Sequence, residues 1–153
     1  MNSNAPLSMK WSQTTHYTIA PAYQSSGAAC VDIHSTETAR YAVPAGGTLE
    51  VDTGIKLAIP EGWCGLVFSR SGHGFNHGVR LANCVGVIDS DYRGNIKIKL
   101  HNDSKVPYTV QEFERVAQIM FVQCPQFTFE QVTDVEVEFE TERGAGGFGS
   151  TGK

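Results

Sequence analysis

Apolar and polar residues alternate over short stretches along most of the chain, and turn-forming residues separate these stretches. The alternation is clear over residues 48–52 and 54–59, an apolar run covers residues 63–68, and Gly and Pro residues break the chain at 44–47 and 60–62. Residues 135–140 alternate strictly, with a glutamate at every second position. Short strands at close spacing, with almost no helical periodicity, predict an all-β sandwich or barrel.

The stretch 83–99 carries the most specific pattern. Apolar residues run up to Ile88, a polar turn-forming cluster follows, and alternation resumes at Ile96. This pattern predicts a hairpin whose tip carries Asp89, Asp91 and Tyr92. A surface hairpin with a solvated acidic tip explains the same pattern without any function.

Residues 111–122 contain several helix-favouring side chains and are the one stretch that could pass for a helix. The β-rich run 119–122 and the β context on both sides favour a turn followed by a buried strand. Residues 1–15 are polar and aperiodic, which predicts a loosely held start. We therefore expect a single β domain over residues 16–142, followed by an arm over residues 143–153.

Composition excludes some partners. The chain has 153 residues, 41% of them hydrophobic, and a net charge of −4 without a long basic cluster, so double-stranded nucleic acid is not an expected partner. No apolar run is long enough for a membrane span or resembles a signal segment, so we expect a cytoplasmic protein, with nuclear and viral-host settings left open. Four separated cysteines predict buried free thiols, although an even number also permits disulfides.

Three segments offer groups that suit a small anionic ligand. Asp32 lies in a predicted strand, where Asp is disfavoured, and an edge-facing carboxylate is the alternative reading. Arg70, Ser71 and Gly72 bring a cation, a hydroxyl and free backbone N–H groups into a predicted tight turn, although a turn with a surface Arg is commoner. The Gly-rich arm 143–153 reads as a lid that orders over an anionic, ring-bearing ligand, or else as a flexible linker.

Residues 86–94, Gly-Val-Ile-Asp-Ser-Asp-Tyr-Arg-Gly, resemble the third signature motif of the trimeric deoxyuridine triphosphatases (dUTPases). Four further segments resemble the other motifs of that family in their usual order, at residues 25–33, 69–78, 115–118 and 143–153. Four positions depart from the family pattern: Cys30, Ser69, Asn76 and Phe113. Phe113 stands where the family usually has Gly, so we expect this turn to differ in shape.

The resemblance implies a jelly-roll β-sandwich that assembles as a homotrimer, with active sites shared between subunits. It also implies hydrolysis of dUTP to dUMP and pyrophosphate, with Asp89 orienting the attacking water. The resemblance assigns base and sugar contacts to Asn83, Tyr92, the backbone near Lys97, and Phe148. It assigns phosphate contacts to Arg70, Ser71, Gly72, Gln118, Arg143, Gly149, Ser150 and Thr151. Asp32 would help to hold the hydrated Mg2+ of the substrate, which the phosphates bind directly.

Two other functions remain open at this stage. A deoxycytidine triphosphate deaminase shares the fold and the triphosphate, but the 83–92 segment and the full Gly-rich arm favour the uracil hydrolase. A regulatory or structural jelly-roll module would be expected to lack Asp89 or the arm, and the sequence keeps both.

Overall fold

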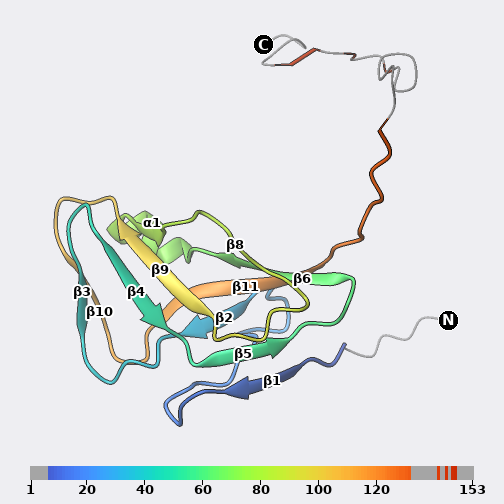
Figure 1. The fold of residues 1–153 in the computed structure, drawn as a ribbon. Helices are drawn as coiled ribbons and strands as arrows, with labels where there is room; N and C mark the ends of the chain where they lie inside the picture. Colours follow the sequence, from blue (N-terminus) through green and yellow to red (C-terminus); the bar gives the residue numbers. More distant parts are fainter. Residues whose placement is uncertain (1–6, 132–140, 142–143, 145, 148–153) are drawn as a thin grey trace.

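The computed structural model describes residues 7–131, 141, 144 and 146–147. Its described part is built from strands and one short helix, as Figure 1 shows. In chain order the elements are β1 (Lys10–Gln13), β2 (Val31–His34), β3 (Tyr41–Val43), β4 (Thr48–Asp52), β5 (Ile55–Ala58), β6 (Trp63–Phe68), α1 (Ser71–His77), β7 (Val79–Leu81), β8 (Gly86–Ile88), β9 (Lys97–Asn102), β10 (Tyr108–Val110) and β11 (Arg115–Gln123). The predicted all-β class is confirmed.

Two sheets make the main part of the fold, and every described pair of strands is antiparallel. One sheet has the order β2-β11-β6-β8 and the other the order β4-β9-β7. The pairs β1-β5 and β10-β3 complete the described strands. Strands distant in sequence are therefore neighbours, and β11 lies between β2 and β6, which places three segments of the candidate site in one sheet.

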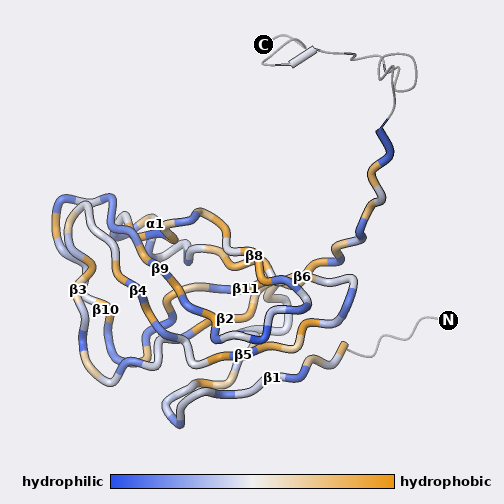
Figure 2. Tube along the Cα trace, in the orientation of Figure 1, coloured by the Kyte–Doolittle hydropathy of each residue, from blue (hydrophilic) through white to orange (hydrophobic). Residues whose placement is uncertain are grey.

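The core follows from the alternation along the strands. Ile33, Val51, Ile98 and Leu100 are all at most 3% exposed, whereas the residues between them along each strand are half-buried or exposed. The same alternation appears as changes of colour along the tube in Figure 2. Removing these apolar side chains from water is the main favourable contribution to folding, and it leaves the alternate positions free for function.

The predicted hairpin over residues 83–99 is wrong in its pairing. Strand β8 pairs with β6, and β9 pairs with β4 and β7, so the two strands belong to different sheets. A two-residue turn holds neighbouring strands together, but the connection over residues 89–96 is long enough to cross the roughly 10 Å between packed sheets. The backbone N–H of Ile96 instead donates to the carbonyl of Ile55 at 2.9 Å.

Helix α1 corrects the tight turn that was predicted after Arg70. Seven residues are too few to display helical periodicity, and Gly72 and Gly74 disfavour a helix. The helix forms because tertiary contacts stabilise it: His73 is buried at 5% exposure, and Gly78 ends the helix in the left-handed conformation at φ 66°.

Three further expectations meet the structure with different results. The turn and buried strand predicted over residues 111–122 are confirmed as β11 and the turn before it. The loosely held start is wrong for Lys10–Gln13, because these residues form β1 and pair with β5. Phe113 adopts φ 52°, the left-handed region that glycine favours, and whether the turn differs in shape from that of the family stays a prediction.

The cysteines are all free, but the expected burial holds for Cys64 alone. Cys30 is half-buried, and Cys84 and Cys124 are exposed. Within the described residues, no helix is both long and apolar enough to cross a membrane.

Candidate active site

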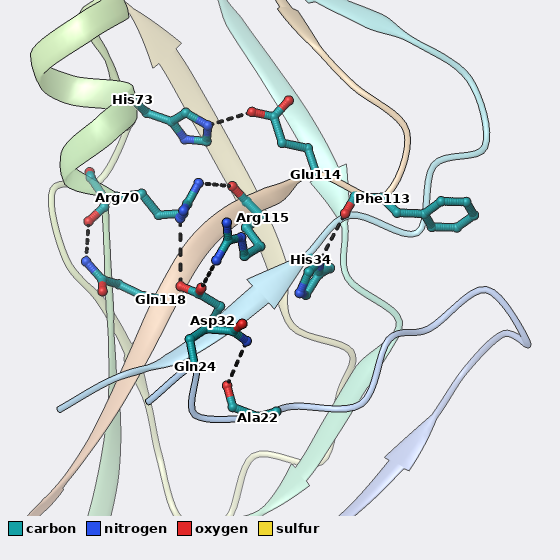
Figure 3. Close-up of polar contacts among 11 residues, drawn as sticks. Ala22, Gln24, Asp32, His34, Arg70, His73, Phe113, Glu114, Arg115 and Gln118 are labelled. Atoms are coloured by element: carbon teal, nitrogen blue, oxygen red, sulfur yellow. Dashed lines mark hydrogen bonds and ion pairs between the residues drawn. The ribbon is translucent and has the colours of Figure 1, made fainter. Parts of the chain in front are cut away.

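A cluster of charged and polar side chains forms where β2, β11 and the start of α1 meet (Figure 3). Arg115 Nη1 donates to Asp32 Oδ2 at 3.1 Å, and Arg70 Nε lies 3.7 Å from Asp32 Oδ1. Arg70 Nη1 donates to the Arg115 carbonyl at 3.0 Å, and Gln118 Nε2 donates to the Ser69 carbonyl at 2.9 Å. The structure therefore brings together Asp32, Arg70 and Gln118, three residues that were predicted from separate motifs.

Sheet register explains this convergence. On β11, Gln118 is paired with Asp32 of β2 on one side and with Phe68 of β6 on the other. Strand β6 ends at Phe68, so the chain carries Arg70 directly past the same point. Because strand pairing aligns the three segments, no long loop is needed to bring them together.

The charges of the cluster suit a polyanion. Two guanidinium groups face the Asp32 carboxylate, whose side chain is only 14% exposed. Guanidinium groups bind phosphate oxygens through paired hydrogen bonds. Ser71 and Gly72 lie exposed at the start of α1, and a Cβ added at Gly72 would meet nothing within 4 Å. Space is therefore available beside the cluster.

A second group lies between β8 and β9. Asn83 and Lys97 both line a pocket of about 680 Å³, together with Gly86 and Ile96. A Cβ added at Gly86 would lie 3.3 Å from Val67 Cβ, so a larger residue there would press on the neighbouring strand. The pocket has an amide side chain and backbone groups at its rim, which can read the edge of a small planar ring.

The Lys97 side chain does not turn toward this pocket's amide. Its Nζ donates to Glu50 Oε1 at 2.8 Å, and this hydrogen bond and the charge of Glu50 raise the pKa of Lys97. The interaction leaves the backbone of β9, rather than the ammonium group, as the part of Lys97 available for recognition. This agrees with the backbone contact that the resemblance implies.

Asp89 and Tyr92 occupy the crossing between the two sheets. Asp89 is exposed and lines a different pocket, of about 720 Å³, together with Trp63, Cys64 and Cys124. The Tyr92 hydroxyl donates to the Asn95 carbonyl at 2.9 Å, and a side chain at Gly94 would collide with the Tyr92 ring. Gly94 therefore lets the tyrosine ring lie flat over the backbone.

Within one chain, the predicted site residues thus form separate groups. Asp32, Arg70 and Gln118 meet in the first, Asn83 and Lys97 line the second, and Asp89 lines neither. Five predicted residues lie outside the described part of the chain: Arg143, Phe148, Gly149, Ser150 and Thr151.

The role of Arg115 was not predicted from the sequence, although the motif that contains it was noted. The ion pair of Arg115 with Asp32 depends on the register between β2 and β11 and on the bulge between Arg115 and Ala117. The only available signal was a second cation close to Gln118 in sequence.

The side chains of the described residues limit how a metal ion can be held. Among these residues, no group of three or more His, Cys, Asp or Glu side chains is arranged to bind a metal ion. Asp32 is the single carboxylate of the cluster, and both of its oxygens face guanidinium groups. This donor set fits Mg2+ that is carried mainly by phosphate oxygens and water, as is usual for nucleotide-bound Mg2+, and not an ion held by the protein alone.

Comparisons with known proteins agree with the fold and the motifs. The dUTPase family profile matches residues 16–152. The deoxyuridine 5'-triphosphate nucleotidohydrolase of Paraburkholderia phymatum is 42% identical over 135 residues, which is 87% of this chain and 88% of that protein. The enzyme of the same name from Neisseria meningitidis serogroup A is 36% identical over 150 residues, covering 97% of this chain and 98% of that one.

Solved structures give the same result. The Staphylococcus bacteriophage 80alpha dUTPase with dUPNHPP has a TM-score of 0.86 and 25% identity, covering 95% of this chain and 99% of that chain. A mutant dUTPase from phage phi11 of S. aureus, described with a structural Mg(II) ion, has a TM-score of 0.76 and covers 85% of this chain and 99% of that one, and at 21% identity it supports the fold alone. The shared motifs, the matching fold and the relatives of nearly equal length together identify this chain as a member of the dUTPase family.

Proposed function

We propose that this chain hydrolyses dUTP to dUMP and pyrophosphate, with the triphosphate bound at the cluster around Asp32. The ion pair of Arg70 with this carboxylate, beside Gln118, which pairs with Asp32 in the sheet, is the observation that carries the proposal. Arg70, Ser71, Gly72 and Gln118 donate to phosphate oxygens, and the two guanidinium groups attract the polyanion. Asp32 contributes through the water shell of Mg2+, which supplies charge neutralisation at the phosphates when it is bound.

The pocket between β8 and β9 is the proposed base site. Uracil presents two carbonyl acceptors with one N–H donor between them, and the Asn83 amide and the β9 backbone at Lys97 can match that order. Cytosine would place an amino donor against a donor and leave polar groups unpaired, which disfavours the deaminase alternative. Tyr92 packs on the deoxyribose and leaves no room for a ribose 2′-hydroxyl.

Asp89 is the proposed general base. Its carboxylate orients a water molecule for in-line attack on the α-phosphorus and accepts the proton as the oxygen–phosphorus bond forms. The bond from the α-phosphorus to the bridging oxygen breaks, and pyrophosphate leaves. A positioned base contributes roughly 10²- to 10⁴-fold to such a reaction.

A complete site requires more than one chain in this proposal. Within one chain, Asp89 takes no part in the contacts that hold the Asp32 cluster together. A homotrimer with shared sites resolves this separation, because one subunit brings the phosphate cluster and another brings Asp89 and the base pocket. A third contributes its arm, in which Arg143, Gly149, Ser150 and Thr151 donate to phosphate and Phe148 stacks on the base.

The proposed setting is the cytoplasm, where the activity removes dUTP before it reaches DNA synthesis. The expected partners are dUTP, dUMP and further copies of this chain, without nucleic acid or membrane.

The test is product analysis on a panel of nucleotides, comparing the natural chain with Asp89→Asn. We expect pyrophosphate from dUTP and no ammonia from dCTP, and we expect Asp89→Asn to bind a non-hydrolysable dUTP analogue while turnover falls roughly 10²- to 10⁴-fold. Near-normal turnover by Asp89→Asn would remove the assignment of the base, and ammonia release from dCTP would favour the deaminase.

A further inference from the structure

The proposed phosphate donors lie on two segments, residues 70–72 and the part of β11 that carries Gln118. The backbone ladder between β6 and β11 does not extend to the first of these segments. The ladder between β6 and β11 ends at the Phe68–Gln118 pair, and the chain then leaves the sheet toward α1. Beyond that point, side chains of the described residues make three polar links: Gln118 to the Ser69 carbonyl, Arg70 to the Arg115 carbonyl, and His73 to Glu114. The relative position of the two segments therefore depends on these side chains.

Two of the three links use groups that the ligand also needs. The Gln118 amide and the Arg70 guanidinium donate to protein carbonyls, and the same donors are proposed to bind phosphate oxygens. Phosphate binding engages the same side chains, so their orientation must then serve both the ligand and the protein carbonyl. The link between His73 and Glu114 involves neither donor, so it can persist when the triphosphate is bound.

The His73–Glu114 link is buried and is joined to other groups. His73 Nε2 lies 2.7 Å from Glu114 Oε1, and the side chains are 6% and 16% exposed. Glu114 also accepts hydrogen bonds from the Tyr108 hydroxyl and, at 2.6 Å, from the Gln111 backbone N–H. Burial raises the pKa of Glu114, but these three hydrogen bonds outweigh it and the pKa lies below its ordinary value. Glu114 is thus held as a carboxylate with a fixed orientation.

Stability alone is a poor reason for this arrangement. His73 Nδ1 is buried without a hydrogen-bond partner, and a buried polar atom without a partner costs free energy. An apolar side chain of similar volume in place of a buried polar pair is often neutral or stabilising. A function that needs the link would explain why a histidine occupies this place.

We propose that His73 and Glu114 are positioning residues for the triphosphate: their hydrogen bond holds the Arg70–Gly72 segment against the segment carrying Gln118 while the ligand occupies the donors of both. The proposal rests on the phosphate roles proposed for Arg70 and Gln118. His73 and Glu114 touch no substrate atom in this account, because their hydrogen bond, which joins α1 to the residue before β11, is buried (Figure 3).

The experiment compares four full-length variants in binding and thermal unfolding: His73→Leu, His73→Gln, Phe75→Ala and Arg70→Ala. The probes are an α,β-imido analogue of dUTP and deoxyuridine, which lacks phosphate. For His73→Leu we expect roughly 10-fold weaker analogue binding, the size associated with one hydrogen bond to a charged group, with deoxyuridine binding unchanged. The melting temperature should fall, because the buried Glu114 carboxylate loses one of its partners. His73→Gln should recover most of the affinity, because its carboxamide restores a donor to Glu114.

Phe75→Ala is the matched control, because Phe75 lies on the same helix with its side chain 94% exposed, and it should bind as the natural chain does. Normal analogue binding by His73→Leu would overturn the proposal, as would equal losses for both probes with a lower melting temperature. Arg70→Ala distinguishes a failure of the positioning role from a failure of the proposed phosphate site. If it loses analogue affinity while His73→Leu does not, the positioning role alone fails; if Arg70→Ala also binds normally, the proposed phosphate site fails with it.

Discussion

At position 113 we expect a glycine variant to be more stable than an alanine variant, which is the reverse of the usual order. Phe113 is not a glycine, yet its φ is 52°. The conformation is held from both sides, because its N–H donates to the Glu37 carbonyl at 3.2 Å and its carbonyl accepts from His34 Nδ1 at 2.9 Å. The ring packs near Tyr17 with 6.3 Å between centroids. Replacing Phe113 by Ala and by Gly removes this ring contact equally, so the two variants differ only in backbone preference.

The left-handed conformation costs an L-residue about 1–2 kcal/mol that glycine does not pay. Part of this advantage is offset, because the greater conformational freedom of glycine in the unfolded chain lowers the stability of the glycine variant by about 0.4–1 kcal/mol. We therefore expect Phe113→Gly to be more stable than Phe113→Ala by about 0.5–1 kcal/mol, or a few degrees in melting temperature for a chain of this size.

The assay is urea unfolding of both variants at one protein concentration, because the proposed assembly would make apparent stability depend on concentration. The matched control is the same pair at Glu112, an exposed neighbour that is not among the positive-φ residues, where Ala should be equal to or better than Gly. Equal stability at 113, or Ala above Gly, would refute a left-handed Phe113.

Three other predictions concern the site. Tyr92→Ala should raise UTP turnover relative to dUTP by opening the space beneath the sugar, and an unchanged ratio in a parallel assay would make Tyr92 a packing residue. Truncation after Glu142 should leave the melting temperature nearly unchanged but sharply reduce dUTP hydrolysis, because the arm is proposed to exclude water as it closes; full activity would show a linker. The pKa of Glu114 is lowered in the fold, so its stabilisation is present above the ordinary pKa of about 4.3 and is lost as pH falls through the folded pKa. Glu114→Gln should therefore unfold more easily than the natural chain at pH 7 and approach it below about pH 4, and a constant difference would contradict this.

Local pattern was sufficient for the β class but not for strand pairing. The alternation around Ile96 and Ile98 identifies β9, and the β-rich run after Arg115 identifies β11. The pattern contains no information on partners, so β8 and β9 were joined as a hairpin although they lie in different sheets. Helix α1 was missed for a related reason, because it depends on the burial of His73 against a residue 41 positions away.

The motifs indicated most of the charged cluster, since Asp32, Arg70 and Gln118 each stood out by residue type or by resemblance. Their contact could not be predicted, because it follows from the register of β11 with β2 and β6. The sequence pattern did not single out His73, which is buried in α1. Its hydrogen bond to Glu114 depends on α1 lying beside the turn before β11.

The most direct test of the shared site is complementation between two inactive variants, Arg70→Ala and Asp89→Asn. They are mixed in equal amounts, unfolded and refolded together, and assayed for pyrophosphate release from dUTP. If one subunit supplies Arg70 and another Asp89, random assembly of trimers leaves both groups intact in about one quarter of the sites. We therefore expect about one quarter of the natural activity from the mixture and almost none from either variant alone. No recovery in correctly assembled mixed trimers would contradict a site divided between subunits.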